Sequence, residues 1–234
     1  MCGRYQLASA DLRLAINWLV EPLGPEEQIA PVPGVPLDDQ DACPSQWTPV
    51  LVRREGREEM ALMRWGLIPA WARDETIARG TFNARAETLA EKPAFKGAYK
   101  YRRGVVPASK YYEWRRTPDG RRTRERYEFR LKNGDPLLMA ALWETWHSPD
   151  GSPIDTVAVV TTGPNALVEP IHDRMPALLT RETAREWTHA PYDPERLGRL
   201  LIPFPAERMI VEESPVEPPK PAAAKAEPAQ LGLF

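Results

Sequence analysis

The chain has 234 residues, of which 42 % are hydrophobic and 27 % charged, with a formal net charge of −2 at pH 7. This is ordinary globular usage and excludes a chain that is disordered throughout. The near-neutral charge gives no general attraction to nucleic acid or anionic membranes, so a polyanion would need a local basic patch. No apolar run reaches the about 18 residues of a membrane span, and the N-terminus lacks a signal-peptide pattern. We therefore expect a cytoplasmic protein without a membrane partner.

The number and spacing of the cysteines and histidines argue against disulfide bonds and metal sites. The two cysteines, Cys2 and Cys43, form neither a disulfide framework nor a C-x-x-C pair. The three histidines lie far apart and show no zinc-site spacing. We expect no metal and no cofactor.

The N-terminal part predicts a helix over 9–20, capped by Ser9, with Leu12, Ile16 and Leu19 on one face. Residues 21–46 are rich in proline and predict a long irregular loop. Strand-like patterns then follow at 48–54, 59–65, 104–108, 126–131, 137–143 and 154–162.

Turn signals separate several of these strands, at Pro118-Asp119-Gly120, Asn133-Gly134 and Pro149-Asp150-Gly151. Consecutive strands joined by short turns favour an antiparallel sheet over βαβ units. Helices are expected at about 164–169, 180–188 and 194–201, the last one beginning with Pro194 after the capping residue Asp193. The fold class is therefore α+β.

The composition changes beyond about residue 212. The stretch from Glu212 to Ala229 is a Pro/Ala/Glu segment that has little to bury, so it predicts an extended tail. We divide the chain into a folded domain at 1–211 and a tail at 212–234. The tail ends in a hydrophobic peptide made of Gln230, Leu231, Gly232, Leu233 and Phe234.

Cys2 is the first candidate for chemistry. Removal of Met1 would leave Cys2 with a free α-amine beside its thiol, and such an aminothiol condenses with an aldehyde to a Schiff base that the thiol closes to a thiazolidine. An α-amine has a pKa of about 7.7–8.0, so part of it is neutral and nucleophilic near neutrality. The alternative is a small buried cysteine near the terminus.

Three further motifs hold polar residues that suit a reactive site. In NARAET at 83–88, Arg85 could bind a phosphate or carboxylate, although Asn83 could equally cap a helix. In YYEW at 111–114, Glu113 lies among aromatic residues that would raise its pKa, or it is an exposed strand residue. In IHDRMP at 171–176, His172 is the natural acid or base near pH 7, flanked by Asp173 and Arg174.

Two other stretches suit nucleic acid. RWGLIPAW at 64–71 offers Trp65 and Trp71 as platforms for unpaired bases, with core packing as the alternative. The basic run at 121–126, with arginines at 102, 103, 115 and 116, could follow phosphates or form a solvated hairpin face.

Taken together, the motifs resemble one family. MCGR at the start, RWGLIPAW, NARAET, VVPASKYYEW, MAALWE and IHDRMP occur in the order seen in the SOS-response-associated-peptidase (SRAP) family, over residues 1 to about 210. The resemblance implies a compact single domain around a twisted, barrel-like antiparallel sheet with flanking helices. It also implies a sensor of abasic sites in single-stranded DNA, whose N-terminal cysteine forms a stable thiazolidine crosslink with the ring-opened sugar.

Roles follow from the resemblance at the matching positions. It implies that Cys2 is the nucleophile, that Asn83 orients it and the sugar, and that Glu113 and His172 handle protons. Arg4, Arg85 and Trp65 would contact DNA. We add three DNA-binding candidates from the neighbouring residues, namely Trp71, Lys110 and Arg174. How Glu113 and His172 divide their work is left open.

The chain departs from the family pattern at two places. Ser109-Lys110 replaces an acidic-glycine pair, and Lys110 would strengthen phosphate binding or perturb the loop before Glu113. Cys43 stands where the family usually has alanine, and we interpret it as a small-residue substitute.

The C-terminal peptide resembles the motif by which bacterial repair and replication proteins bind the sliding clamp. Leu231, Leu233 and Phe234 would be pocket anchors and Gln230 a hydrogen-bonding residue. The alternative is a hydrophobic end that docks on its own domain. Clamp binding would make the protein nucleoid-associated and part of SOS-linked repair in a bacterium.

Two competing functions remain. A thiol-dependent peptidase would use Cys2 activated by His172, but it would not need the cysteine at a position where trimming exposes the amine. A passive single-stranded DNA-binding module would bind intact and abasic strands equally and would tolerate loss of Cys2.

Overall fold

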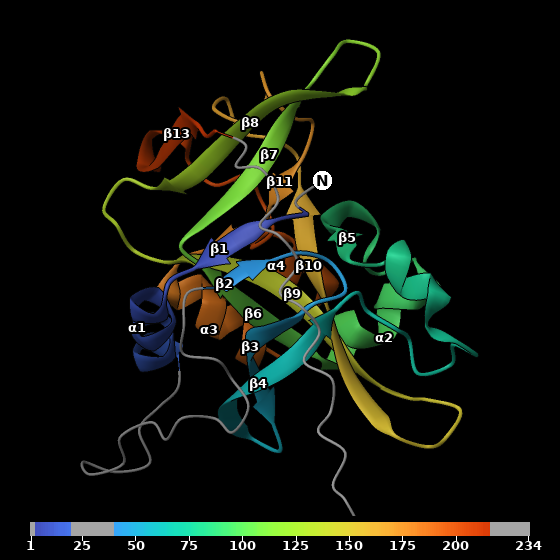
Figure 1. Cartoon of the computed structure of the whole chain (residues 1–234). Helices are drawn as coiled ribbons and strands as arrows, with labels where there is room; N and C mark the ends of the chain where they lie inside the picture. The colour runs from blue at the N-terminus through green and yellow to red at the C-terminus, as the bar shows by residue number, and fades with distance from the viewer. Residues whose placement is uncertain (1–2, 20–39, 216–234) are drawn as a thin grey trace, which may run out of the picture.

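The structure is a computed structural model that describes residues 3–19 and 40–215 (Figure 1). Three expectations lie wholly or mostly outside the described residues: the reactive Cys2, most of the loop expected at 21–46, and the tail beyond residue 215 with its peptide from Gln230 to Phe234. The tail is predicted to begin at 212, but Glu212 and Glu213 still belong to the strand β13 (Met209–Glu213). No helix in the described ranges is both long enough and apolar enough to span a membrane.

A closed barrel of five strands forms the centre of the fold (Figure 1). The strands pair in the ring β10-β4-β3-β6-β9 and back to β10. Their bounds are β3 (Trp47–Arg54), β4 (Arg57–Trp65), β6 (Arg103–Ala108), β9 (Leu137–His147) and β10 (Pro153–Thr162). The six predicted strand segments all lie within observed strands, and closure of the barrel leaves no open edge in this ring.

The predicted α+β fold with a barrel-like sheet is confirmed, and one pair within the mainly antiparallel ring is parallel. Thr156 and Val157 of β10 pair in parallel with Arg64 and Trp65 of β4, whereas the other four pairings of the ring are antiparallel. A closed ring with an odd number of strands cannot alternate direction at every step. A five-stranded barrel therefore requires at least one parallel pair.

Beyond β4, the same edge of β10 is occupied by β5 (Asn83–Arg85). Asn83 pairs in parallel with Val159, and Arg85 with Thr161. Gly66 makes this exchange of partners possible: its φ is +134°, and a Cβ there would lie 3.0 Å from the main-chain O of Ala78. Only glycine fits both the backbone angle and the close approach. Two short strands, β11 (Met175–Pro176) and β12 (Leu178–Leu179), extend the barrel sheet.

A second sheet continues directly from the barrel, because only Ser109 separates β6 from β7. Its order is β13 (Met209–Glu213), β8 (Arg122–Leu131), β7 (Lys110–Arg116), β1 (Tyr5–Leu7) and β2 (Gln40–Ala42). Tyr111 stacks on Phe129 across the β7–β8 pair with ring centroids 4.8 Å apart. In Figure 1 the tip of the β7–β8 hairpin projects away from the barrel.

The helices agree in part with the predictions. Those predicted at 9–20, 180–188 and 194–201 are observed as α1 (Ser9–Leu19), α3 (Arg181–His189) and the shorter α4 (Pro194–Gly198). The helix predicted at 164–169 is wrong: the side-chain oxygen of Asn165 accepts from the main-chain N–H groups of Leu167 and Val168, which forms a turn instead. The prediction omitted α2 (Pro93–Tyr101) and three short 3₁₀ helices, η1 (Glu75–Arg79), η2 (Ala86–Thr88) and η3 (Ala206–Arg208).

Arg103 joins two of these helices to the barrel. Its side chain is 8 % exposed, and its guanidinium donates to the main-chain O atoms of Tyr99 and Lys100 at 2.9 and 3.0 Å, of Trp187 at 2.6 Å, and of Ala190. These carbonyls belong to the C-terminal ends of α2 and α3, where a cation is favourable. The sequence grouped Arg103 with a phosphate track, but burial against four carbonyls makes it structural.

Candidate functional site

A polar cleft of about 420 Å³ lies between the start of the chain, the β7–β8 hairpin and the loop that follows β10. Its lining combines one buried carboxyl group, one imidazole and three guanidinium groups with apolar surface. The lining residues are Gly3, Arg4, Cys43, Phe82, Glu113, Trp114, Arg116, Arg122 and His172.

Glu113 provides the carboxyl group from the middle of β7. Its neighbour Trp114 lines the same cleft, because the pairing of β7 with β8 is irregular between Trp114 and Arg116 and the alternation of side chains is interrupted there. The Glu113 side chain is only 4 % exposed. Burial raises the pKa of the Glu113 carboxyl to about 7, although the positive charge of Arg116 opposes the rise. Near neutral pH this group can therefore both give and accept a proton.

His172 faces Glu113 from the loop between β10 and β11. Its Nε2 lies 3.9 Å from Oε2 of Glu113, and its side chain is 2 % exposed. Burial lowers the pKa of His172 to about 4, with Arg116 adding to the fall and Asp173 opposing it. The imidazole is therefore neutral at physiological pH, and the usual order of a carboxyl and an imidazole pKa is inverted in this pair.

Each ring nitrogen of His172 faces an N–H donor. Nε of Arg116 donates to Nε2 at 2.8 Å, and the main-chain N–H of Arg174 donates to Nδ1 at 3.0 Å. Oδ1 of Asp173 also lies 3.0 Å from Nδ1. A neutral imidazole accepts at only one nitrogen, so these two donations belong to different tautomers. We assign the lone pair to Nε2, which faces the guanidinium, and the single ring proton to Nδ1, where the Asp173 carboxylate accepts it in place of the donation from Arg174.

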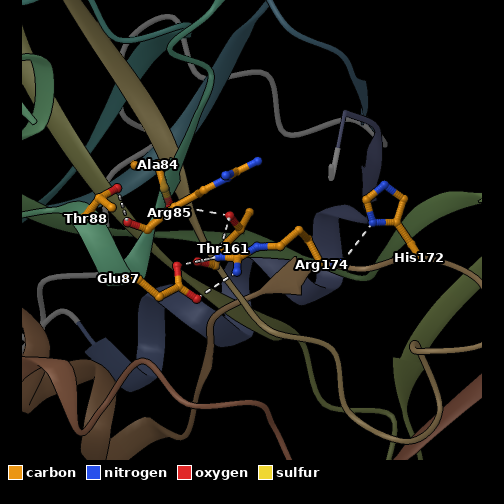
Figure 2. Close-up of polar contacts among 7 residues, drawn as sticks. All are labelled: Ala84, Arg85, Glu87, Thr88, Thr161, His172 and Arg174. Carbon is orange, nitrogen blue, oxygen red and sulfur yellow. Dashed lines mark hydrogen bonds and ion pairs between the residues drawn. The ribbon is translucent and has the colours of Figure 1, made fainter. Parts of the chain in front are cut away.

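Arg174 fastens this loop to the barrel. Its guanidinium donates to both carboxylate oxygens of Glu87, at 2.7 and 2.9 Å, and to the main-chain O of Thr161 at 2.6 Å. Figure 2 shows the Arg174 side chain directed away from His172, toward Glu87 and Thr161. The sequence placed Arg174 among DNA-binding residues, but in this arrangement its guanidinium positions the loop that carries His172.

Asn83 and Arg85 lie at the two ends of the three-residue strand β5 and differ in burial. Asn83 is 7 % exposed in β5, beside β10, whereas the Arg85 side chain is exposed. Figure 2 shows the Arg85 guanidinium extending away from Glu87. Its charge is thus available to a ligand outside the fold.

The other predicted cationic residues have acidic partners. Arg4 lines the cleft and forms two hydrogen bonds with the carboxylate of Asp41, one of them 2.9 Å long from Nε. Lys110 donates to Glu128 at 2.8 Å, on the neighbouring strand β8. Phosphate binding by either residue would compete with these carboxylates.

The two tryptophans differ in exposure. Trp65 is 1 % exposed, its Nε1 donates to the main-chain O of Phe82 at 2.8 Å, and its ring lies 5.3 Å from that of Tyr5. Base stacking by Trp65 is therefore a wrong prediction, because the ring belongs to the core. Trp71 is 61 % exposed and keeps a ring face for a ligand.

Sequence reasoning did not name Phe82 or Trp114 as site residues, and it named Arg116 and Arg122 only as members of a possible phosphate track. The guanidinium of Arg122 lies 3.5 Å from the ring centroid of Trp114, a cation–π contact at the cleft wall. The signals were present in the YEW motif and the basic run, but spacing alone did not say which arginines turn inward. Cys43 also lines the cleft, and burial raises the pKa of its thiol.

Within 3–19 and 40–215, no group of three or more His, Cys, Asp or Glu residues is arranged to hold a metal ion. The described part of the site therefore consists of ordinary acid–base and cationic side chains.

These features define a mixed α/β barrel protein with a basic cleft built around a buried carboxyl–imidazole pair. The chain belongs to the SOS response associated peptidase (SRAP) family, whose sequence profile matches residues 1–217. This match confirms the family resemblance that the motifs indicated.

Individual relatives agree with this assignment. The chain is 37 % identical over 210 residues to the abasic site processing protein YoqW of Bacillus subtilis, covering 89 % of this chain and 90 % of the relative. It is 34 % identical over 148 residues to the abasic site processing protein HMCES of Xenopus tropicalis, covering 55 % and 44 %. A crystal structure of a protein from Bacteroides thetaiotaomicron superposes with a TM-score of 0.76 at 26 % identity, covering 91 % of each chain.

Proposed function

We propose that this protein processes abasic sites in single-stranded DNA by forming a covalent thiazolidine crosslink through Cys2 after removal of Met1. The crosslink would shield the lesion during replication and SOS-linked repair. The relatives named abasic site processing proteins support the substrate. The single observation that carries the chemistry is the buried pair of Glu113 and His172 in a cleft that is also lined by Gly3, the residue bonded to Cys2.

The reaction requires a proton to be moved at several steps. Opening of the sugar transfers a proton from the hydroxyl on C1′ to the ring oxygen and yields an aldehyde. The α-amine of Cys2 adds to this aldehyde, loss of water gives the Schiff base, and the thiol then adds to the same carbon and closes the five-membered ring. A group that both donates and accepts near pH 7 suits this sequence.

Glu113 fits that role because burial raises its pKa to about 7. His172, whose pKa burial lowers to about 4, is neutral and can accept a proton but holds none to spare as an acid. We therefore propose Glu113 as the group that exchanges protons with the sugar and Schiff base, with His172 beside it as acceptor and Asn83 orienting the sugar.

The cationic residues suit the DNA backbone. Arg122 lines the cleft with its guanidinium over the Trp114 ring, and Arg85 is exposed on β5. Arg4 and Lys110 would bind phosphate by exchanging their acidic partners for it. Trp71, with an exposed ring, is the tryptophan we propose for base stacking.

The crosslink is tested by mixing the protein with a single-stranded oligonucleotide that carries one abasic site. Intact mass spectrometry and a denaturing gel should show an adduct that survives heat and detergent. A Cys2→Ala variant and a form that retains Met1 should give none, whereas Cys43→Ala, which removes the other thiol of the chain, should react. No adduct from protein shown to lack Met1 would refute the covalent mechanism.

Two alternatives are separated by the same reagents. A peptidase that uses the Cys2 thiolate would tolerate acetylation of the α-amine, whereas thiazolidine formation would not. A passive DNA-binding module would bind intact and abasic strands equally and would be indifferent to Cys2→Ala.

We further propose that the C-terminal peptide binds a bacterial sliding clamp through Leu231, Leu233 and Phe234, with Gln230 supplying hydrogen bonds. Its support is the sequence of the peptide and the Pro-rich composition of the segment before it. Such binding would keep the protein at replicating DNA.

A further inference from the structure

Arg116 is the residue of the cleft whose contacts the crosslinking chemistry does not explain. It ends β7, three residues after Glu113, and its main-chain N–H donates to the O of Ile171 at 3.0 Å. Its guanidinium donates from Nε to Nε2 of His172 at 2.8 Å and from Nη1 to the main-chain O of Gly120 at 2.8 Å. All of these acceptors are neutral.

The hydrogen bond from Arg116 occupies Nε2 of His172, the nitrogen that would accept a proton from Glu113. With the ring proton on Nδ1, the lone pair on Nε2 is the only basic site of His172. Nε2 also faces Glu113, whose Oε2 is 3.9 Å away. As long as Arg116 donates to Nε2, no proton can pass from the Glu113 carboxyl to the imidazole.

A DNA phosphate offers Arg116 a better partner than a neutral imidazole. Hydrogen bonds between two charged groups are shorter and roughly twice as strong as neutral ones, and a guanidinium binds phosphate through two parallel N–H groups. The Arg116 side chain is exposed at the cleft, and the neighbouring Arg122 adds a second positive charge there. A phosphate that enters the cleft beside the lesion would therefore draw Arg116 away from His172.

Building on the proposed function, we propose that Arg116 is a specificity-determining residue that leaves Nε2 of His172 only when it binds a DNA phosphate flanking the abasic sugar. With Arg116 on the phosphate, a proton can move from the Glu113 carboxyl to Nε2, leaving a carboxylate and an imidazolium whose Nδ1–H is held by Asp173. Aldehydes that lack a flanking phosphate leave Arg116 in place. The acid–base pair is thus released by the correct substrate.

The effect of Arg116 on His172 can be tested separately from the other groups around the imidazole. Among the described residues, the groups that face His172 include Glu113 and Arg116 from β7, and Asp173 and the main-chain N–H of Arg174 from its own loop. The guanidinium of Arg122, on the other arm of the hairpin, lines the same cleft. Replacing Arg116 by methionine removes the donor and keeps an unbranched side chain. Arg13, which is exposed on α1 and remote in sequence from the cleft residues, provides the matched control Arg13→Met.

The kinetic experiment compares two abasic oligonucleotides, one with ordinary phosphodiesters beside the lesion and one with uncharged methylphosphonates. Wild-type protein and Arg13→Met should crosslink the uncharged substrate at least tenfold more slowly. For Arg116→Met, the crosslinking rate should fall less than threefold from the phosphodiester to the methylphosphonate strand. On the methylphosphonate strand this variant should crosslink faster than the wild type. Equal sensitivity of wild type and Arg116→Met to the linkage would overturn the proposal.

A second measurement does not depend on crosslinking and so separates this inference from the proposed function. ¹⁵N spectra of histidine-labelled protein report the state of Nε2, with His147 and His189 as internal references. Adding a single strand with a tetrahydrofuran abasic analogue should raise the pKa of His172 in the wild type, and its methylphosphonate version should not. Arg116→Met should show the raised pKa without DNA. An unchanged His172 signal in the wild type on saturation with the tetrahydrofuran strand would refute displacement of Arg116, even if the protein formed no adduct.

Discussion

Oε2 of Glu113 lies 3.9 Å from Nε2 of His172, and burial inverts the usual order of their pKa values. The carboxyl pKa rises to about 7 and the imidazole pKa falls to about 4. Between these values the proton of the pair resides on the carboxyl group, the reverse of the order in water. This inversion leaves the proton of the pair on Glu113 and His172 neutral, which is the basis for proposing Glu113 as the acid of the site.

Removal of the acid should slow crosslinking without preventing DNA binding. We expect Glu113→Gln to reduce the rate of adduct formation by about 10²–10⁴-fold, because a positioned general acid or base contributes that much. The part of the pH–rate profile that reflects a group near pH 7 should disappear. Rapid-quench gels at several pH values measure this, with Glu212→Gln on β13 as an exposed control. A profile that keeps its inflection near pH 7 in Glu113→Gln would assign the titration to another group.

The same pair makes the stability of the fold depend on pH in two opposing ways. The folded pKa of Glu113 is raised above 4.5, so the native state binds the extra proton and its stability falls as pH rises from about 4.5 to 7. The folded pKa of His172 is lowered below 6.5, so stability rises as pH increases from about 4 to 6.5. Each contribution is about 3 kcal/mol, and the two largely cancel in the wild type between pH 4.5 and 6.5.

Single substitutions should expose each contribution. The free energy of unfolding of Glu113→Gln should rise by about 3 kcal/mol between pH 4 and 6.5, and that of His172→Gln should fall by about 3 kcal/mol between pH 4.5 and 7. Urea denaturation at half-unit pH intervals provides the measurement. Parallel curves for both variants and the wild type would contradict the inverted pKa order.

The pair formed by Arg174 and Glu87 should act on His172 through the loop. Arg174→Met removes the hydrogen bonds from the guanidinium to Glu87 and Thr161, and we expect it to slow crosslinking and to shift the pKa of His172. Glu87→Gln should have the same effects in weaker form, because Thr161 still accepts. A double-mutant cycle on unfolding should give a coupling of about 0.5–1 kcal/mol, since Glu87 is half-exposed. A changed affinity for intact single strands, with an unchanged His172 pKa, would show instead that Arg174 contacts DNA.

Arg103 should be important for folding and irrelevant to DNA. Arg103→Met leaves main-chain carbonyls at the ends of α2 and α3 without a donor, and we expect a loss of about 3 kcal/mol. Urea denaturation measures the loss, and Arg13→Met is the exposed control. If the folded fraction of Arg103→Met crosslinks at less than half the wild-type rate, the residue has a role beyond the helix ends.

Deletion of residues 230–234 should separate two properties of the protein. Because Leu231, Leu233 and Phe234 are the proposed anchors, the shortened chain should lose binding to a purified bacterial sliding clamp and keep its full crosslinking rate. Surface plasmon resonance and the abasic-site gel measure the two properties. Retained clamp binding would remove the C-terminal peptide as the contact.

The local sequence pattern was sufficient to predict most of the longer strands and three of the helices. The strand segments, α1, α3 and the start of α4 followed from alternation and capping, because burial of one face imposes a period on the sequence. The three-residue strands β1 and β5 were missed because a segment this short carries no period. The parallel β10–β4 pair was missed because it arises from closure of a five-stranded ring, which is a property of the whole sheet.

The sequence by itself determined the family and named Glu113 and His172, because their motifs are distinctive and contiguous. Only the tertiary structure decided which of the two holds the proton, since desolvation and the approach of Arg116 depend on segments far apart in the chain. The tertiary structure also shows that Trp65 is buried in the core and that Arg174 pairs with Glu87. A residue type states what a side chain is able to do, whereas burial and partners, which are set by packing, decide what it does.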